Sequence, residues 1–292
     1  MSQPSHPLLA LAWMLGAALS FTAMAVAGRE ISAELNTFEL MLYRSVIGFC
    51  IVFLLLWQSA GGMAQIRTAR MGQHIQRNIV HFFGQNLWFY GVAVIPLSQL
   101  VALEFTNPIW VALFAPLMLG EVLTRARILA AAIGFAGVLI VAQPGYAPVE
   151  WGHLAGLGAA IGFALNTIFT KRIMRHDTVL CVLFWMTLSQ AAMALVLSLP
   201  GGIPIPSTPL WKWIAVVGVC GLTAHYCLTS ALGAAPATLV APMEFIRLPT
   251  VAIVGMVVYH EPLLTSVFIG AAVILAGNLL SVHAERTKHG PD

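Results

Sequence analysis

The chain has 292 residues, of which 59% are hydrophobic and 9% charged, and its formal net charge is +3. A water-soluble domain carries about 25% charged residues, so this composition and the mean hydropathy of +0.88 exclude an ordinary soluble domain and indicate a surface that faces lipid. The small charge, without a run of Lys or Arg, gives no indication of a nucleic-acid partner.

Ten apolar runs are long enough to be membrane helices, because a span needs about 20 mostly apolar residues and must pair its backbone groups internally. They are expected at 8–28, 38–58, 74–95, 98–119, 125–142, 152–171, 179–199, 210–233, 237–259 and 263–283. Gly- and Pro-rich stretches separate several of them. The first run has no basic segment before it and no clear cleavage site, so we interpret it as a retained helix.

Basic residues in the connecting segments predict the orientation of these helices. With ten spans, one side of the membrane holds ten of them: Arg67, Arg70, Arg77, Arg125, Arg127, Lys171, Arg172, Arg175, Arg286 and Lys288. The other side holds Arg29 and Lys212. Since short cytoplasmic loops are enriched in Lys and Arg, both termini are predicted to be cytoplasmic, including a tail at 284–292.

The two halves of the sequence resemble each other. A shift of 140 residues superposes Pro96 on Pro236, Glu104-Phe105 on Glu244-Phe245 and Glu121 on Glu261, and a shift of 142 superposes Arg29 on Lys171. Each half holds five predicted spans, so the halves must cross the membrane in opposite directions. The predicted fold is all-α, with two inverted five-helix repeats at 8–142 and 152–283 around a central cavity.

Several motifs resemble the EamA domain of the drug/metabolite transporter superfamily. They are Phe89–Ser98, Leu42-Tyr43-Arg44, Ala241–Phe245, and the paired turns Leu119–Leu123 and Tyr259–Leu263. The resemblance extends over about residues 8–283. It implies a ten-helix transporter of a bacterial inner membrane that moves metabolites outward, closest to exporters of aromatic and other amino acids. The second half departs from this pattern, because no arginine there matches Arg44.

Polar side chains in membrane helices usually face a protein interior or a water-filled cavity. Asn78, His81, Gln85 and Trp88 recur every three or four residues and therefore share one helix face. We expect this face to line a substrate cavity together with Tyr90, Asn166, Trp185, His225 and Tyr226. The alternative is that these residues only form hydrogen bonds that hold the helices together.

Glu104 and Glu244 lie well inside predicted helices, so one of them could couple transport to protons. Arg247 is three residues after Glu244, which favours a structural ion pair between these two instead. Arg44 either pairs with Glu39, extends to the membrane surface or binds a substrate carboxylate. Glu121 and Glu261 are expected to cap the helices that follow them.

These observations favour a transporter for a small metabolite, working as a monomer in lipid by alternating access. The four cysteines, Cys50, Cys181, Cys220 and Cys227, lie in apolar runs without metal-ligand spacing, so no metal, cofactor or catalytic residue is expected. An integral membrane enzyme is the alternative, although no catalytic motif is present. A channel is disfavoured, because no filter-like loop is visible.

Overall fold

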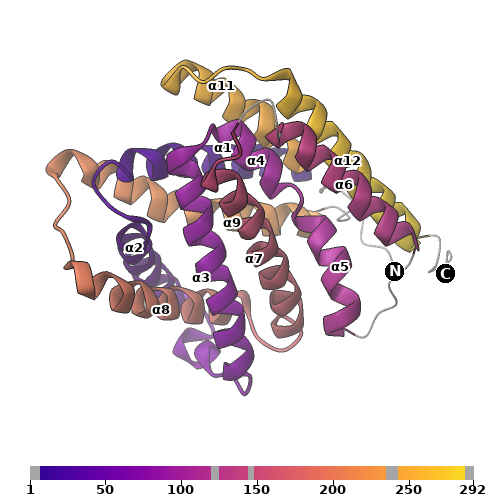
Figure 1. Ribbon diagram of the computed structural model, residues 1–292. Coiled ribbons are helices and arrows are strands. Elements are labelled where there is room, and N and C mark those ends of the chain that lie inside the picture. The colour runs from indigo at the N-terminus through magenta and orange to yellow at the C-terminus, as the bar shows by residue number, and fades with distance from the viewer. Residues whose placement is uncertain (1–6, 120–124, 144–147, 235–242, 287–292) are drawn as a thin grey trace.

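The computed structural model describes residues 7–119, 125–143, 148–234 and 243–286 (Figure 1). Its α-helices are α1 (Pro7–Ile31), α2 (Thr37–Gln58), α3 (Met71–Val94), α4 (Leu97–Glu104), α5 (Asn107–Leu119), α6 (Arg125–Ala142), α7 (Trp151–Ile173), α8 (Val179–Ser198), α9 (Trp211–Ala234), α11 (Arg247–Tyr259) and α12 (Thr265–Arg286). Short 3₁₀ turns are η1 (Gly62–Ile66), η2 (Leu199–Gly201), η3 (Thr208–Leu210) and η4 (Glu244–Ile246). Within these ranges there is no strand, as the all-α prediction requires.

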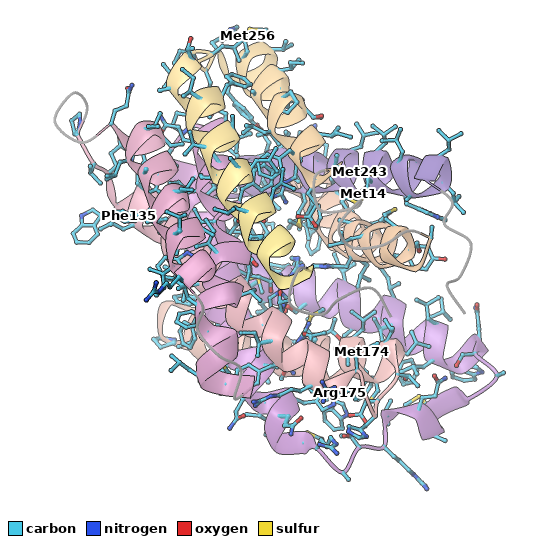
Figure 2. All side chains as sticks on the ribbon, turned by 90° about the vertical axis from the view of Figure 1, so that its right-hand side faces the viewer. Met14, Phe135, Met174, Arg175, Met243 and Met256 are labelled. Carbon is cyan, nitrogen blue, oxygen red and sulfur yellow. The ribbon has the colours of Figure 1, made fainter. Side chains whose placement is uncertain are left out.

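Among the described residues, five helical segments are long and apolar enough to cross a membrane: Leu8–Ile31, Thr37–Gln58, Trp151–Thr170, Val179–Gly201 and Thr208–Leu228. Ile128–Ala142 and Thr265–Leu280 are apolar but shorter. Large apolar side chains cover the outside of the bundle, including Phe135 on α6 and Met256 on α11, which are labelled in Figure 2. The structure therefore supports a multi-pass membrane protein, and the count of ten spans stays a prediction.

The predicted helix 98–119 is divided into α4 and α5 at Phe105 and Thr106. Pro108 explains the break, because proline has no N–H to bond the carbonyl four residues back and its ring clashes with that carbonyl. The predicted helix 237–259 is also irregular: its described part begins with η4 and continues as α11, while residues 237–242 lie outside the described ranges. Phe105 and Phe245, which the sequence repeat superposes, are in contact, with ring centroids 4.3 Å apart and ring planes tilted by 37°.

The major helix contacts join the first half of the chain to the second. α1 packs on α9, α3 on α7, α2 on α8, and α6 on α12, and Figure 1 shows the last pair running side by side. The crossing of α3 and α7 is close because glycines meet there: a Cβ on Gly162 would lie 2.9 Å from Gly84 Cα. The buried core, with Phe82, Phe89 and Leu100 among its largest members, lies between the two halves.

Candidate functional site

A cavity of about 380 Å³ lies between the two halves. Helices α1, α3, α7, α9 and α12 contribute to its wall, as do the interrupted segments around Phe105 and Phe245. Its aromatic lining consists of Phe21, Trp88, Phe89, Phe105, Phe163 and Phe245. Ligand pockets of about 300–1,000 Å³ are typically apolar and aromatic with a few placed polar groups, and this cavity has that character.

His81, Gln85 and Trp88 lie on the cavity side of α3. The predicted shared face is thus present, because residues three and four apart on a helix point the same way. All three side chains are buried, and His81 Nδ1 lies 3.1 Å from Gln190 Nε2 on α8. Asn166 and His225, from α7 and α9, also line the cavity.

Four residues of the predicted lining are outside the cavity. Asn78 donates its amide to Trp185 O at 2.9 Å and Ser189 Oγ at 2.8 Å, which ties α3 to α8. Trp185 donates its indole N–H to Ile66 O at 2.9 Å. Tyr90 and Tyr226 are 40% and 66% exposed on the outer surface. These contacts fit the alternative of helix association rather than substrate binding.

An ion pair crosses the cavity wall from one half to the other. Arg247 Nη2 lies 2.9 Å from Glu104 Oε1, and the Trp88 indole N–H donates to Glu104 Oε2 at 2.8 Å. The Arg247 guanidinium also lies over the rings of Phe21 and Phe105, 5.0 and 5.1 Å from their centroids. Arg247 therefore pairs with Glu104 rather than with the expected Glu244, because α11 packs against α4.

Among the described residues of the cavity wall, two asparagine side chains offer free acceptors to a ligand. Asn278 donates to Phe105 O at 3.0 Å, and its own Oδ1 has no partner within the described residues. Asn166 Oδ1 is likewise buried and unpaired in the described part of the chain. Asn278 was not predicted from the sequence, although a lone asparagine in an apolar helix carries the same signal that singled out Asn166.

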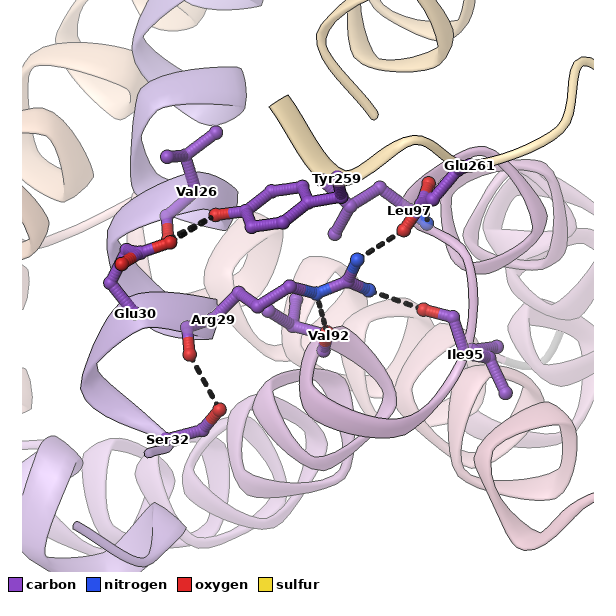
Figure 3. A network of polar contacts seen from close by, with 9 residues as sticks. All are labelled: Val26, Arg29, Glu30, Ser32, Val92, Ile95, Leu97, Tyr259 and Glu261. Carbon is purple, nitrogen blue, oxygen red and sulfur yellow. Dashed lines mark hydrogen bonds and ion pairs between the residues drawn. The ribbon is translucent and has the colours of Figure 1, made fainter. Parts of the chain in front are cut away.

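Arg29 is the centre of a second polar cluster, at the C-terminal end of α1 (Figure 3). Its Nε donates to Val92 O at 2.6 Å, and its other nitrogens contact Ile95 O and the Glu261 carboxylate. Glu261 Oε2 accepts from Leu97 N at 3.0 Å. The cavity wall on α1 runs from Met14 to Met24, so this Arg29 cluster lies beyond the cavity's end and links α1 to both halves.

A tyrosine beside this cluster adds two further links to α1. Tyr259 donates its hydroxyl to Glu30 Oε1 at 2.9 Å, and its ring centroid lies 4.9 Å from the Arg29 guanidinium carbon. The sequence had suggested that Glu261 caps α12, but it does not. It caps α4 instead, because Leu97 is the first residue of that helix. Glu121, its counterpart in the repeat, lies outside the described residues.

Arg44 neither reaches the membrane surface nor pairs with Glu39. Its side chain is buried in α2. The Glu39 carboxylate accepts from Asn36 N at 2.8 Å and thereby completes the capping box of that helix. The Glu39 carboxylate is therefore bound at the start of α2, where the first N–H groups have no partner within the helix, and it does not pair with Arg44.

Outside the cavity, Asp177 joins the connection between α7 and α8 to α3. It accepts from Thr68 Oγ1 at 2.7 Å, and His74 Nε2 lies 2.7 Å from the same oxygen. Burial by itself would raise the pKa of Asp177, but these hydrogen bonds and the nearby basic groups hold that pKa below its ordinary value. The Cys181 thiol also lies nearby, in the first turn of α8.

The model of the EamA-like transporter family matches this sequence twice, over residues 8–143 and 150–282. The chain belongs to the EamA-like transporter family. A riboflavin transporter of Rhizobium johnstonii is 26% identical to this EamA protein over 283 residues, covering 97% of this chain and 94% of that one. An S-adenosylmethionine uptake transporter of Rickettsia bellii is 25% identical over 281 residues, covering 95% and 94%.

A riboflavin transporter of Vibrio cholerae is 27% identical to the EamA protein over 280 residues, covering 94% of this chain and 93% of that one. A solved crystal structure superposes on it with a TM-score of 0.64 at 17% identity, covering 94% and 96% of the two chains. That likeness supports the fold. Family and relatives together indicate a multi-pass transporter of a bacterial inner membrane that carries a small metabolite.

Proposed function

We propose that this EamA protein is a secondary transporter for a small, flat heteroaromatic metabolite such as riboflavin. The observation that carries the proposal is the cavity wall, where aromatic rings surround the unpaired amide oxygens of Asn166 and Asn278. Aromatic faces suit a planar ring system, and carbonyl acceptors suit the N–H and O–H groups of such a solute. The relatives from Rhizobium johnstonii and Vibrio cholerae are both named riboflavin transporters.

Export of amino acids, expected from the sequence resemblance, is the competing function. Charged groups that are not already paired with each other bind a zwitterion most readily. Arg247 and Glu104 are bonded to each other, and Glu104 also holds Trp88. We therefore assign Glu104 the role of positioning the Trp88 ring, rather than of coupling transport to protons.

The proposed mechanism is alternating access between two inverted five-helix units, residues 8–142 and 152–283, with both termini in the cytoplasm. Helix packing supports it. The symmetry of such a repeat relates the contact of α1 with α9 to the contact of α7 with α3. It relates α2 to α8 and α6 to α12, so each of these pairs packs across the symmetry axis. In this mechanism the Arg29 cluster is the closed periplasmic gate, and the cavity faces the cytoplasm. Opening requires that Arg29 release Glu261.

Counterflow in proteoliposomes tests the function without assuming an energy source. Vesicles loaded with unlabelled riboflavin receive labelled riboflavin outside, and the protein should concentrate the label inside, chemically unchanged. An integral membrane enzyme would return a modified compound. S-adenosylmethionine, tryptophan and other amino acids are added as competitors, and counterflow of tryptophan but not riboflavin would favour the competing function.

A matched pair of tryptophan variants locates the site. Trp88→Ala removes a cavity wall and should reduce counterflow at least tenfold, since truncating a large buried aromatic contact costs more than about 1.4 kcal/mol. Trp57→Ala removes an indole that is 74% exposed on the outer surface and should leave counterflow unchanged. Equal rates in wild type and Trp88→Ala would refute the assignment of this cavity.

A further inference from the structure

Arg44 is a charged group buried in α2 without a carboxylate partner in the described part of the chain. Its side chain is 7% exposed, and Nη1 lies 3.9 Å from Met41 Sδ. When the Gln85 amide is oriented so that both of its ends are satisfied, its oxygen accepts from Nη1 and Nη2 at 2.9 and 3.0 Å. The Nε–H group finds no partner among the described residues.

The residue next to Arg44 leaves a second polar atom unpaired at the same place. Ser45 Oγ is buried and has no hydrogen-bond partner among the described residues. Arg44 and Ser45 line a small internal pocket together with Gly48, Thr187, Gln190 and Gly218, on α2, α8 and α9. The pocket volume is about 10 Å³, which is close to the least space that holds a single water.

The charge balance of this region argues for an anion rather than a water. A guanidinium stays protonated in proteins, and an uncompensated charge taken out of water costs several kcal/mol. A water could accept from Nε and the hydroxyl but could not offset the charge. Arg77 adds to the imbalance, because it is buried with Thr170 Oγ1 at 3.1 Å and Asn78 Oδ1 at 2.9 Å as its partners. Arg247, by contrast, has Glu104.

We propose that Arg44 and Ser45 form a binding site for one small monovalent anion, a halide ion or a small carboxylate. Gln85 connects this site to the transport cavity, because its side chain lines the cavity and also contacts Arg44. Only the link between this anion site and transport rests on the proposed function. Occupancy by an anion adds an acceptor for Nε and for the serine hydroxyl and offsets the guanidinium charge.

The thermal unfolding of the purified full-length protein in detergent tests this site without any transported solute. Sodium chloride replaces sodium gluconate, whose anion is too large for this pocket, at constant ionic strength, and acetate is titrated in the same way as a small carboxylate. We expect a saturable rise of about 2–4 °C in the unfolding midpoint with at least one of them. A rise with chloride identifies a free ion as the ligand, whereas a rise with acetate alone identifies a carboxylate.

Three variants separate the site from general salt effects. Arg44→Gln should abolish the rise, and Ser45→Ala should increase the half-saturating anion concentration about tenfold. Lys212→Gln removes an exposed ammonium that lies over the Trp213 ring, and its rise should equal that of wild type.

Three results overturn the proposal. They are a wild-type midpoint that neither anion changes, a rise that survives Arg44→Gln, and an unchanged half-saturating concentration in Ser45→Ala. The serine variant decides the matter if Arg44→Gln does not fold. Because these measurements involve no riboflavin, they test the anion site even if the riboflavin counterflow assay fails.

Discussion

Replacing Glu261 by glutamine should weaken the closed end of the cavity. The change keeps the size of the side chain and removes the charge that pairs with Arg29. The amide oxygen can still accept from Leu97 N, so the cap of α4 is retained. In the proposed alternating-access mechanism, the loss falls on the closed state of this end and leaves the open state unaffected.

The structure sets the size of this effect. The side chains of Arg29 and Glu261 are 16% and 11% exposed, so the pair is neither fully desolvated nor at the surface. Arg29 keeps its contacts with Val92 O and Ile95 O. A loss of about 1–2 kcal/mol is therefore expected, and it shifts the ratio of open to closed states about 5- to 30-fold toward the open one.

Labelling of a cysteine in the cavity measures this shift. Met24→Cys places a thiol in the wall nearest to the Arg29 cluster, in a background where the four native cysteines are replaced. Glu261→Gln should raise its labelling rate by a membrane-impermeant maleimide added from outside by the same 5- to 30-fold factor. Glu34→Gln, whose carboxylate binds the Ser207 backbone and hydroxyl instead, serves as the matched control. An unchanged rate in a well-folded Glu261→Gln protein would refute the gate.

Three further predictions concern packing, the site and pH. Gly162→Ala should destabilise the protein by about 1–3 kcal/mol, seen as a lower unfolding midpoint, because its Cβ would lie 2.9 Å from Gly84 Cα. Trp88→Phe should weaken apparent riboflavin affinity about 3- to 10-fold in counterflow, because it loses the hydrogen bond to Glu104. The pKa of Asp177 is lowered in the folded state, so its stabilisation is present above the ordinary carboxyl pKa and is lost as pH falls through the lowered value. Asp177→Asn should lower the unfolding midpoint at neutral pH and flatten its decline in acid.

Each of these three predictions has a control and a contrary result. Gly72→Ala should not lower the midpoint, because a Cβ there meets no atom within 4 Å. Trp57→Phe alters an indole exposed to the outside and should keep wild-type affinity. For Asp177, an acid decline as steep as that of wild type would show that its contacts with Thr68 and His74 contribute no pH-dependent stability.

Much of the helical layout and part of the cavity wall could be predicted from local sequence. His81, Gln85 and Trp88 share one face because helix geometry alone places residues three and four apart together. The break at Phe105 also had a local signal in Pro108, and Asn278 had one in its apolar surroundings. Asn78 and Tyr226 show the limit of such signals, since a polar side chain can equally bind a neighbouring helix or face outward.

The sequence by itself determined the membrane class, most of the helical segments and the family, because hydropathy, helix period and turn motifs are properties of short stretches of chain. Only the tertiary structure decided which charges meet: Arg247 with Glu104 rather than Glu244, Glu261 with Arg29 and α4 rather than α12, and Arg44 with no carboxylate among the described residues. These choices depend on how helices from the two halves pack. A buried charge binds the partner that packing brings within a few ångströms, however far away that partner lies along the chain.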